Sequence, residues 1–377
     1  MLKECMKKLA LIFTMDVSLK TWYGKGMISR EVKLYNSLSK HFDKIYFFTY
    51  GYRDDLEYSS FLEHKIDIIP MPLFFSIRKL RKIMVIIYSF LLPLLHIKKL
   101  KDIEFIKTNQ MKGAWAALFA KKIFKCKFIL RTGYTWSKFY ENESKNYLKV
   151  KLIKLIESIC YKNADEVIVS SNFDRDYIKT NYKINCEINV IPNYVDVERF
   201  RKLKVQKIKN SIIFIGRLEN QKNLFNLLKA IVGLNYKLTI IGEGSLLKAL
   251  MEYATTYSIN VKFIQRVPNE ELPVLLNKHE IFILPSLYEG TPKVLLEAMA
   301  CGMSVIGTNV VGINEIIIDK FNGLLCETDP VSIHNTIINL VKNGDLKKKL
   351  GNNARDTIIQ NFTFESYLGE ELELYKN

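Results

Sequence analysis

Residues 280–302 read Glu-Ile-Phe-Ile-Leu-Pro-Ser-Leu-Tyr-Glu-Gly-Thr-Pro-Lys-Val-Leu-Leu-Glu-Ala-Met-Ala-Cys-Gly. The apolar run over 281–284 ends at Pro285, which is typical of an inner strand of a parallel sheet. The second half predicts a helix, because Thr291 is a good N-cap, Pro292 suits the first helical position and Gly302 suits the residue after the last turn. The stretch therefore predicts a buried strand, a tight loop and a largely buried helix in direct succession.

Two carboxylates of this stretch, Glu289 and Glu297, are eight positions apart. In one continuous helix they would be about 12 Å apart, at a rise of about 1.5 Å per residue. Glycosidase acid and nucleophile pairs lie roughly 5 to 9.5 Å apart, so the spacing argues against a hydrolase. The helix N-terminus between them favours an anionic group, and carboxylates accept hydrogen bonds from hydroxyls. The pattern therefore suits a ligand that has both an anionic group and hydroxyls, such as a nucleoside diphosphate sugar.

The Glu-x7-Glu stretch resembles the signature of the retaining glycosyltransferases of family 4, which have the GT-B fold. Three further motifs have counterparts in that family, in the same order: Val190-Ile191-Pro192-Asn193-Tyr194-Val195-Asp196 with Arg199-Phe200, Ile215-Gly216-Arg217-Leu218 with Lys222-Asn223, and Ile241-Gly242-Glu243-Gly244. The resemblance covers residues 164–377. It implies two Rossmann-like α/β domains, 1–192 and 193–361, that face each other across a cleft, with a terminal helix over 362–377 that crosses back to the first domain.

Arg217 directly follows an expected strand at 212–215, and Lys222 comes five residues later. Two cations around a loop and a helix start can close on one diphosphate, Arg217 as a planar fork and Lys222 as a point charge. Solvated surface cations are the ordinary alternative, and the position of Arg217 after a strand and a glycine argues against it.

The resemblance also implies the members of the donor site. Arg217, Lys222 and Glu289 are expected to be catalytic as well as donor-binding, and the loop at 263–268 is expected to read the base through backbone groups. The other expected donor-binding residues are Gly26, Gly242, Gly244, Val267, Gly290, Thr291, Pro292, Lys293, Val294 and Glu297. We expect no metal ion and no cofactor.

Gly24 and Gly26 lie in an expected loop between a first strand at 9–15 and a helix at 28–41. A glycine loop at this place lets the backbone approach a phosphate or a sugar closely, and a plain tight turn is the alternative. The resemblance supports the first interpretation, because similar transferases carry a glycine-rich loop here against the donor phosphate.

Many family members have a histidine near the strand expected at 127–130 that bonds the transferred sugar. This chain has no histidine between His96 and His279. The role is therefore empty, or it is filled by Arg131 or Tyr134, which we place on the acceptor side together with Gly24. A structural ion pair is the alternative for Arg131.

The chain has 377 residues, of which 48% are hydrophobic. Single cores stop growing at roughly 250 to 300 residues, so two domains are expected.

Lys3, Lys7 and Lys8 precede an apolar run as in a secretion signal, but Asp16 ends the run after Met15, and a buried strand is predicted instead. The cysteines lack Cys-x-x-Cys spacing, which predicts reduced thiols in the cytoplasm and no disulfide framework or zinc site. They are Cys5, Cys126, Cys160, Cys186, Cys301 and Cys326.

The net charge lies entirely in the first half of the chain. Residues 1–163 have 31 basic and 14 acidic side chains, whereas residues 164–377 have 25 of each. The apolar run over 83–97 is flanked by Arg78-Lys79-Leu80-Arg81-Lys82 and Lys98-Lys99-Leu100-Lys101. It is shorter than the roughly 20 residues that cross a bilayer. Two interpretations of this run remain: a core helix with solvated basic ends, or an interfacial helix attracted to anionic lipid. No motif supports nucleic acid as a partner.

These observations predict a retaining hexosyltransferase that uses a nucleotide diphosphate sugar, with UDP-sugars favoured, and a glycan or lipid-linked acceptor. Surface polysaccharide or glycolipid biosynthesis, in the cytoplasm or on the inner face of the cell membrane, is the expected setting. The alternatives are a GT-B sugar nucleotide epimerase, an inactive nucleotide-sugar binding protein and a Rossmann oxidoreductase. The lack of a Gly-x-Gly-x-x-Gly motif counts against the last.

Overall fold

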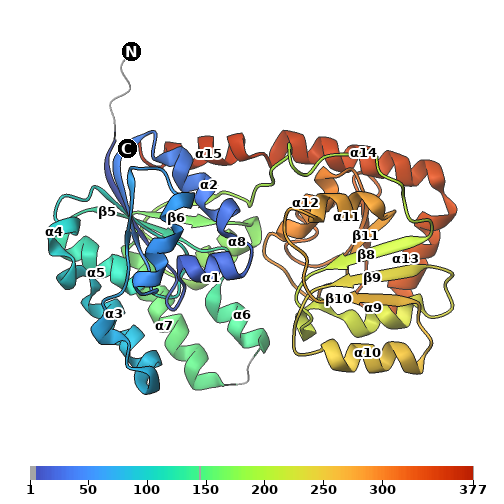
Figure 1. Cartoon of the computed structure of the whole chain (residues 1–377), viewed down its shortest axis with the longest axis horizontal. Coiled ribbons are helices and arrows are strands. Elements are labelled where there is room, and N and C mark those ends of the chain that lie inside the picture. Colours follow the sequence, from blue (N-terminus) through green and yellow to red (C-terminus); the bar gives the residue numbers. More distant parts are fainter. Residues whose placement is uncertain (1–5, 144–145, 377) are drawn as a thin grey trace, which may run out of the picture. The chain divides into compact units, whose positions relative to one another are not determined.

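The computed structural model describes residues 6–143 and 146–376 (Figure 1), so Lys3 and Cys5 lie outside the described part. The chain divides into two compact units, Met1–Ile191 with Leu368–Asn377, and Pro192–Tyr367. Each unit is built on one sheet whose described strands pair in parallel, with helices as the connections. The predicted class, two Rossmann-like α/β domains, is therefore confirmed.

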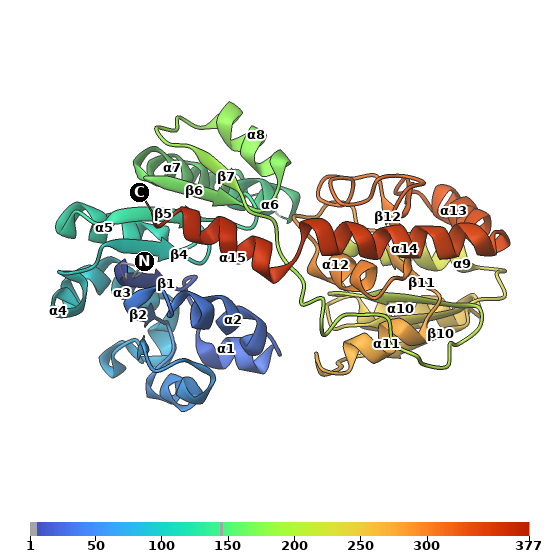
Figure 2. The same cartoon turned by 90° about the horizontal axis from the view of Figure 1, so that it is seen from above.

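The first unit has a seven-stranded sheet in the order β3-β2-β1-β4-β5-β6-β7 (Figure 2). Its strands are β1 Met6–Ile12, β2 Phe42–Phe48, β3 Ile66–Ile69, β4 Phe105–Thr108, β5 Lys127–Arg131, β6 Glu166–Val169 and β7 Ile188–Val190. Its α-helices are α1 Leu19–Gly24, α2 Ile28–Leu38, α3 Arg81–Leu95, α4 Ile97–Leu100, α5 Ala114–Phe124, α6 Trp136–Glu143, α7 Tyr147–Asn163 and α8 Asn172–Asn181. Short 3-10 helices lie at Arg53–Phe61, Leu73–Phe75 and Arg78–Leu80. The strand order reverses between β1 and β4.

The second unit has a six-stranded sheet in the order β10-β9-β8-β11-β12-β13. Its strands are β8 Ser211–Ile215, β9 Lys237–Ile241, β10 Val261–Ile264, β11 Ile281–Leu284, β12 Ser304–Thr308 and β13 Leu324–Cys326. Its helices are the 3-10 turn Asn220–Lys222, α9 Leu224–Ile231, α10 Leu247–Thr256, α11 Leu272–Lys278, α12 Lys293–Ala300, α13 Pro330–Lys342 and α14 Gly344–Asn361. Strand β11 is fully buried and pairs with β8 and β12, as the apolar run predicted. The strand order reverses between β8 and β11.

The last helix, α15 (Phe364–Glu373), begins in the second unit, and the chain from Leu368 onward belongs to the first. Lys107 of β4 is fully buried, and its ammonium pairs with Glu371, which is also fully buried. The Tyr375 hydroxyl donates to the same carboxylate at 2.7 Å. Burial lowers the pKa of Lys107, and the charge of Glu371 opposes that shift. One buried ion pair therefore attaches the C-terminal segment to the first sheet.

The glycine loop expected directly after the first strand is partly wrong. The helix α1 precedes it, so Gly24 is the last residue of a helix and Gly26 lies in the turn before α2, at φ 65°. A capping box explains α1, because Ser18 Oγ accepts from Thr21 N at 3.1 Å and Thr21 Oγ1 accepts from Ser18 N at 3.3 Å. The two glycines thus connect two helices and not a strand and a helix.

The predicted cap of the helix after β11 is also wrong. Pro292, not Thr291, occupies the N-cap position of α12, with an extended backbone and no side-chain cap. The Asn193 side chain donates to the Thr291 carbonyl at 2.8 Å, which holds this residue outside the helix. At the other end the prediction is confirmed, because Gly302 follows the last turn at φ 68°.

The apolar run over 83–97 forms most of α3, which is not a fully buried core helix. Val85, Tyr88 and Leu92 are buried, whereas Ile83 and Leu94 on the same helix are about half exposed. Within the part of the chain that the structure describes, no helix is long and apolar enough to span a bilayer. The helix thus has one buried and one exposed apolar side.

We predict that Glu371→Gln lowers the free energy of unfolding by about 3 kcal/mol, because it leaves the buried ammonium of Lys107 without a charged partner. The matched control is Glu373→Gln on the same helix, since Glu373 pairs with Lys376 at the surface and should change stability by less than about 1 kcal/mol. Denaturant melts of the two variants test this. Equal losses would show that the buried pair does not stabilise the C-terminal segment.

Candidate functional site

Four adjacent strands bring the predicted donor residues of the second unit to one edge of its sheet. In a parallel sheet the carboxyl ends of all strands lie at the same edge, and ligands bind there at the switch point of strand order. Arg217 and Lys222 follow β8, and Glu289 follows β11, on the two sides of that switch. The remaining predicted residues follow β9, β10 and β11: Gly242, Gly244, Val267, Gly290, Thr291, Pro292, Lys293, Val294 and Glu297.

Lys222 and Glu289 form an ion pair at this switch point. Their side chains are only 11% and 8% exposed. The Ser286 hydroxyl donates to the same carboxylate oxygen, Oε1, at 2.6 Å. A carboxylate and an ammonium in dry surroundings need each other as partners. The pair therefore presents a cation and a carboxylate at one point, ready for a ligand that has both phosphate and hydroxyl groups.

Gln221 connects the loops after β8 and β11. Its side-chain amide donates to the Tyr288 carbonyl at 2.8 Å, and its backbone carbonyl accepts from Leu287 N at the same distance. Arg217 Nη2 donates to Gln221 Oε1 at 3.3 Å. Arg217 itself is exposed. The loop that carries Glu289 thus also orients the guanidinium of Arg217, a link that the sequence did not predict.

Two glycines permit close backbone approaches at this edge. A Cβ on Gly242, at φ 150°, would lie 1.8 Å from the Gly216 carbonyl oxygen. A Cβ on Gly312, at φ 82°, would lie 1.9 Å from the Gly290 carbonyl oxygen and 2.7 Å from that of Glu289. No side chain fits at either position. Gly312 therefore packs directly on the peptide that follows Glu289 and fixes the loop.

Glu297 lies in the second turn of α12 and is only 6% exposed. Because the helix begins at Lys293, Glu289 lies outside it, and the separation estimated for one continuous helix does not apply. The N-terminus of α12 has no side-chain cap, as suits a helix end that receives an anion.

The described cysteines offer no nucleophilic thiolate. All five are free thiols, as predicted. Burial raises the pKa of Cys126 and Cys186 to about 11, and that of Cys160, Cys301 and Cys326 to about 12. They remain protonated near neutral pH and serve as apolar packing groups.

The chain contains one Asp-x-Asp triplet, Asp174-Arg175-Asp176, a pattern that can hold a metal ion. Asp174 is buried and accepts from Thr135 Oγ1 at 2.8 Å, whereas Asp176 is exposed and accepts from Arg175 Nε at 2.9 Å. The two carboxylates therefore serve different partners. Among residues 6–143 and 146–376, no group of three or more His, Cys, Asp and Glu side chains is placed to bind a metal. Metal-independent transfer stays a prediction.

In the first unit, two buried carboxylates hold the loop after β5. Asp174 accepts from the backbone N–H of Thr135 at 2.9 Å, and Glu157 accepts from that of Ser137 at 3.1 Å. The Tyr182 hydroxyl donates to Glu157 Oε2 at 2.5 Å. Neither carboxylate was predicted from the sequence, although an acidic residue inside the apolar stretch of α7 is a visible signal.

The predicted acceptor residues lie in this unit. Arg131 ends β5, and its charge helps to lower the pKa of Lys107. It therefore lies close to the buried Lys107, and both its acceptor-side role and the structural ion pair stay predictions. Tyr134 is partly exposed in the following loop, with its ring 4.8 Å from that of Phe139. Gly24, predicted on the acceptor side, and Gly26, predicted to bind the donor, both border open space, because a Cβ on either would meet no atom within 4 Å.

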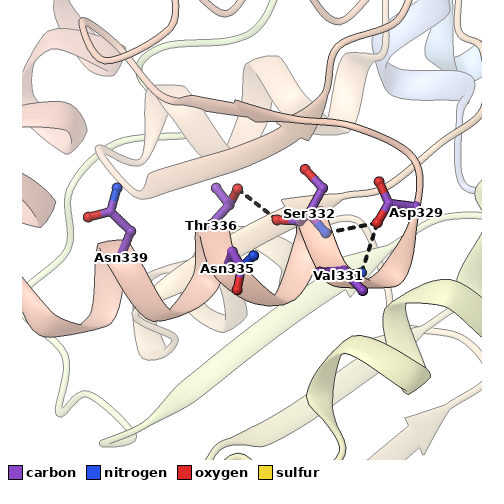
Figure 3. Close-up of a pocket in the computed structure, with 6 residues that line it drawn as sticks. All are labelled: Asp329, Val331, Ser332, Asn335, Thr336 and Asn339. Atoms are coloured by element: carbon purple, nitrogen blue, oxygen red, sulfur yellow. Dashed lines mark hydrogen bonds between the residues drawn. The ribbon is translucent and has the colours of Figure 1, made fainter.

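A pocket of about 580 Å³ lies along the first turns of α13 (Figure 3), and none of the predicted donor residues lines it. Asp329 caps this helix by accepting from Val331 N and Ser332 N, each at 3.0 Å, and Thr336 Oγ1 donates to the Ser332 carbonyl. The pocket is lined by Asp329, Val331, Ser332, Asn335, Thr336 and Asn339. It has no cation for a diphosphate, so the edge with Lys222 is the better donor site.

Comparison with known proteins agrees with this geometry. The model "Glycosyltransferase Family 4" matches residues 32–199, and "Glycosyl transferases group 1" matches residues 195–357. A glycosyltransferase of Methanocaldococcus jannaschii, itself uncharacterized, is 30% identical over 278 residues, which cover 69% of this chain and 70% of that protein. UDP-Gal:alpha-D-GlcNAc-diphosphoundecaprenol alpha-1,3-galactosyltransferase of Escherichia coli is 29% identical over 254 residues, 62% of this chain and 66% of that one.

Among solved structures, Anabaena HepE in complex with UDP has a TM-score of 0.76, with 15% identity and coverage of 98% of this chain and 99% of that one. The fold is thus that of the GT-B transferases. The chain belongs to the glycosyltransferases of family 4, the group 1 glycosyl transferases. The epimerase and inactive-binder alternatives are not favoured.

Burial raises the pKa of Glu157 above its ordinary value of 4.5, against hydrogen bonds that lower it. The folded chain therefore binds the proton of the Glu157 carboxyl more tightly than the unfolded chain does. The free energy of unfolding therefore falls as the pH rises above about 4.5 and the carboxyl ionises. We predict that Glu157→Gln becomes more stable relative to the wild type between about pH 4 and pH 7.5. Thermal melts across that range test this, with Glu141→Gln, an exposed partner of Lys154, as the control. A stability difference that is independent of pH would contradict the assignment.

Proposed function

We propose that the protein is a retaining, metal-independent hexosyltransferase that uses a nucleoside diphosphate sugar. The observation that carries this proposal is the buried Lys222–Glu289 pair at the switch point of the second sheet, with Arg217 oriented beside it. A cation pair suits the diphosphate, and carboxylates suit the sugar hydroxyls. A UDP-sugar is the favoured donor, and the structural similarity to HepE, whose structure contains UDP, supports that choice.

In the proposed reaction, the bond between the anomeric carbon and the diphosphate oxygen breaks. The acceptor oxygen forms its bond to the same face of that carbon, which retains the configuration. Arg217, Lys222 and the N-terminus of α12 stabilise the charge that develops on the leaving diphosphate. The acceptor's proton passes to a diphosphate oxygen. Glu289 and Glu297 hold the sugar by accepting hydrogen bonds from its hydroxyls.

The proposed acceptor is a lipid-linked or growing glycan, and the proposed setting is surface polysaccharide or glycolipid biosynthesis at the inner face of the cell membrane. The name of the Escherichia coli relative states that it acts on a diphosphoundecaprenol-linked sugar. The excess of basic residues in 1–163 is the second support, since each Lys or Arg near an anionic leaflet contributes about 1 kcal/mol.

The function is tested by incubating the protein with a panel of nucleotide sugars and measuring stabilisation by thermal shift and release of nucleoside diphosphate. A bound donor stabilises the folded state, and turnover separates a transferase from an inactive binder. A well-folded sample that neither binds nor turns over any nucleotide sugar would overturn the proposal.

We predict that Glu297→Gln weakens donor binding about tenfold or more while the fold stays intact. The change keeps the shape but removes charge-assisted hydrogen bonds to a donor hydroxyl, each worth roughly 1.5 to 3 kcal/mol. Calorimetric titration with the donor measures the effect, and Glu327→Gln, an exposed carboxylate of the same unit, is the control. Unchanged donor affinity with a lower melting temperature would make Glu297 a structural residue.

We predict that Arg217→Ala and Lys222→Ala each weaken UDP binding but hardly change uridine binding, because their partners are phosphate oxygens. Lys229→Ala, an exposed lysine of α9, is the control for a general loss of positive charge. Arg217 is the cleaner test, since Lys222→Ala also leaves Glu289 without its partner. An equal loss for UDP and uridine would disprove the diphosphate assignment.

A further inference from the structure

Exposed apolar side chains are concentrated in one short segment of the first unit. Of the 32 large apolar residues exposed in the described chain, 12 lie between positions 73 and 97. Scattered exposed apolar residues are normal, but a contiguous group marks a surface that contacts something. The members on α3 are Ile83, Ile86, Ile87, Phe90, Leu91, Leu94 and Leu95.

Contacts with α5 hold α3 in place. Trp115 Nε1 donates to Ser89 Oγ at 2.8 Å, and the Phe90 ring stacks with its centroid 5.8 Å from that of Trp115. Val85, Tyr88 and Leu92 are buried below. The exposed face therefore belongs to a firmly packed helix.

A second helix presents a similar stripe. Leu148, Leu152, Leu155 and Ile159 of α7 are between 44% and 79% exposed, and their spacing places them on one side of the helix. Figure 1 shows α3, α5 and α7 on the same side of the first sheet, and α5 contacts both of the others. We define the exposed apolar residues of α3 and α7 together as the α3/α7 face.

The helices on this side carry an uncompensated positive charge. Helices α3, α4, α5 and α7 contain ten basic residues and one acidic residue, Glu157, which is buried. Three of the ten have acidic partners from other segments, Arg81 with Asp16, Lys121 with Asp165 and Lys154 with Glu141. An apolar face with a basic rim fits the boundary between acyl chains and anionic headgroups.

The basic rim also reaches the carboxyl edge of the first sheet. A pocket of about 770 Å³ at the start of α3 is lined by Asp16, which follows β1, and by Lys79, Leu80, Arg81, Lys82 and Ile83. Arg81 Nη2 donates to Asp16 Oδ1 at 3.1 Å. The basic residues thus continue from the apolar helix to the edge where ligands bind in such sheets.

We propose that the α3/α7 face inserts into the surface of an anionic lipid bilayer without crossing it. A second copy of this chain is a poorer occupant, because the shared face would bring two basic rims together. The inference deepens the proposed function by assigning the surface at which a lipid-linked acceptor would be met. It is independent of the donor and of the sugar transferred.

Vesicle flotation tests the proposal with three variants of the full chain. The first combines Ile83→Gln, Ile87→Gln and Leu94→Gln, and the second combines Leu148→Gln, Leu152→Gln and Leu155→Gln. The control combines Met251→Gln, Ile318→Gln and Ile359→Gln, three exposed apolar residues of the second unit. All nine positions are exposed, so the fold should persist, and thermal melts verify this. The vesicles are phosphatidylcholine alone or with phosphatidylglycerol.

We expect the wild type and the control to float with the phosphatidylglycerol vesicles, less at high salt, and each α3 or α7 variant to bind about tenfold more weakly or worse. The proposal would be overturned if the α3 and α7 variants floated like the control. It would also be overturned if binding did not depend on phosphatidylglycerol, or if the wild type did not bind vesicles at all. Sedimentation that shows a dimer which only the face variants dissociate would assign the face to a second copy instead. UDP binding measured on the same variants separates these outcomes from a failure of the proposed function.

Discussion

The parallel pairing of the strands is the constraint on which the site depends. Because every strand of the second sheet points the same way, its loops of chemical interest all emerge at one edge. Strand order reverses between β8 and β11. The loops that follow these two strands therefore diverge, which leaves room for a ligand between them. Lys222 comes from one side and Glu289 from the other, and their ion pair is where the two halves of this sheet meet.

The neighbours of that pair show how a loop can be fixed without secondary structure. Ser286 donates to Glu289, Gln221 bonds the backbone of the loop, and the backbone of Gly312 packs on the following peptide. Each contact joins segments that lie apart in the chain. Such support matters because a site on loops must hold its geometry to bind a transition state more tightly than a ground state.

The sequence predicted the elements whose signals are local. The buried strand β11 and the glycine after α12 follow from an apolar run and a glycine position that neighbouring residues define, whereas the two-domain α/β fold was implied by the resemblance to family 4. It predicted the donor residues only as separate motifs, because the pairing of Lys222 with Glu289 spans 67 positions. It missed α1, whose capping box is Ser18 and Thr21, and it chose Thr291 as a cap that Pro292 replaces. The exposed side of α3 was also hidden, since a helix that is apolar all round does not reveal its buried face.

Hydrogen–deuterium exchange with and without UDP tests the central claim most directly, because it reports which backbone segments a donor nucleotide orders. The account predicts protection of residues 216–223, 242–246 and 286–297, which follow β8, β9 and β11, with no change along α13 at 331–339. Protection confined to α13, or to the first unit alone, would contradict the assignment of the donor site to the switch point between β8 and β11.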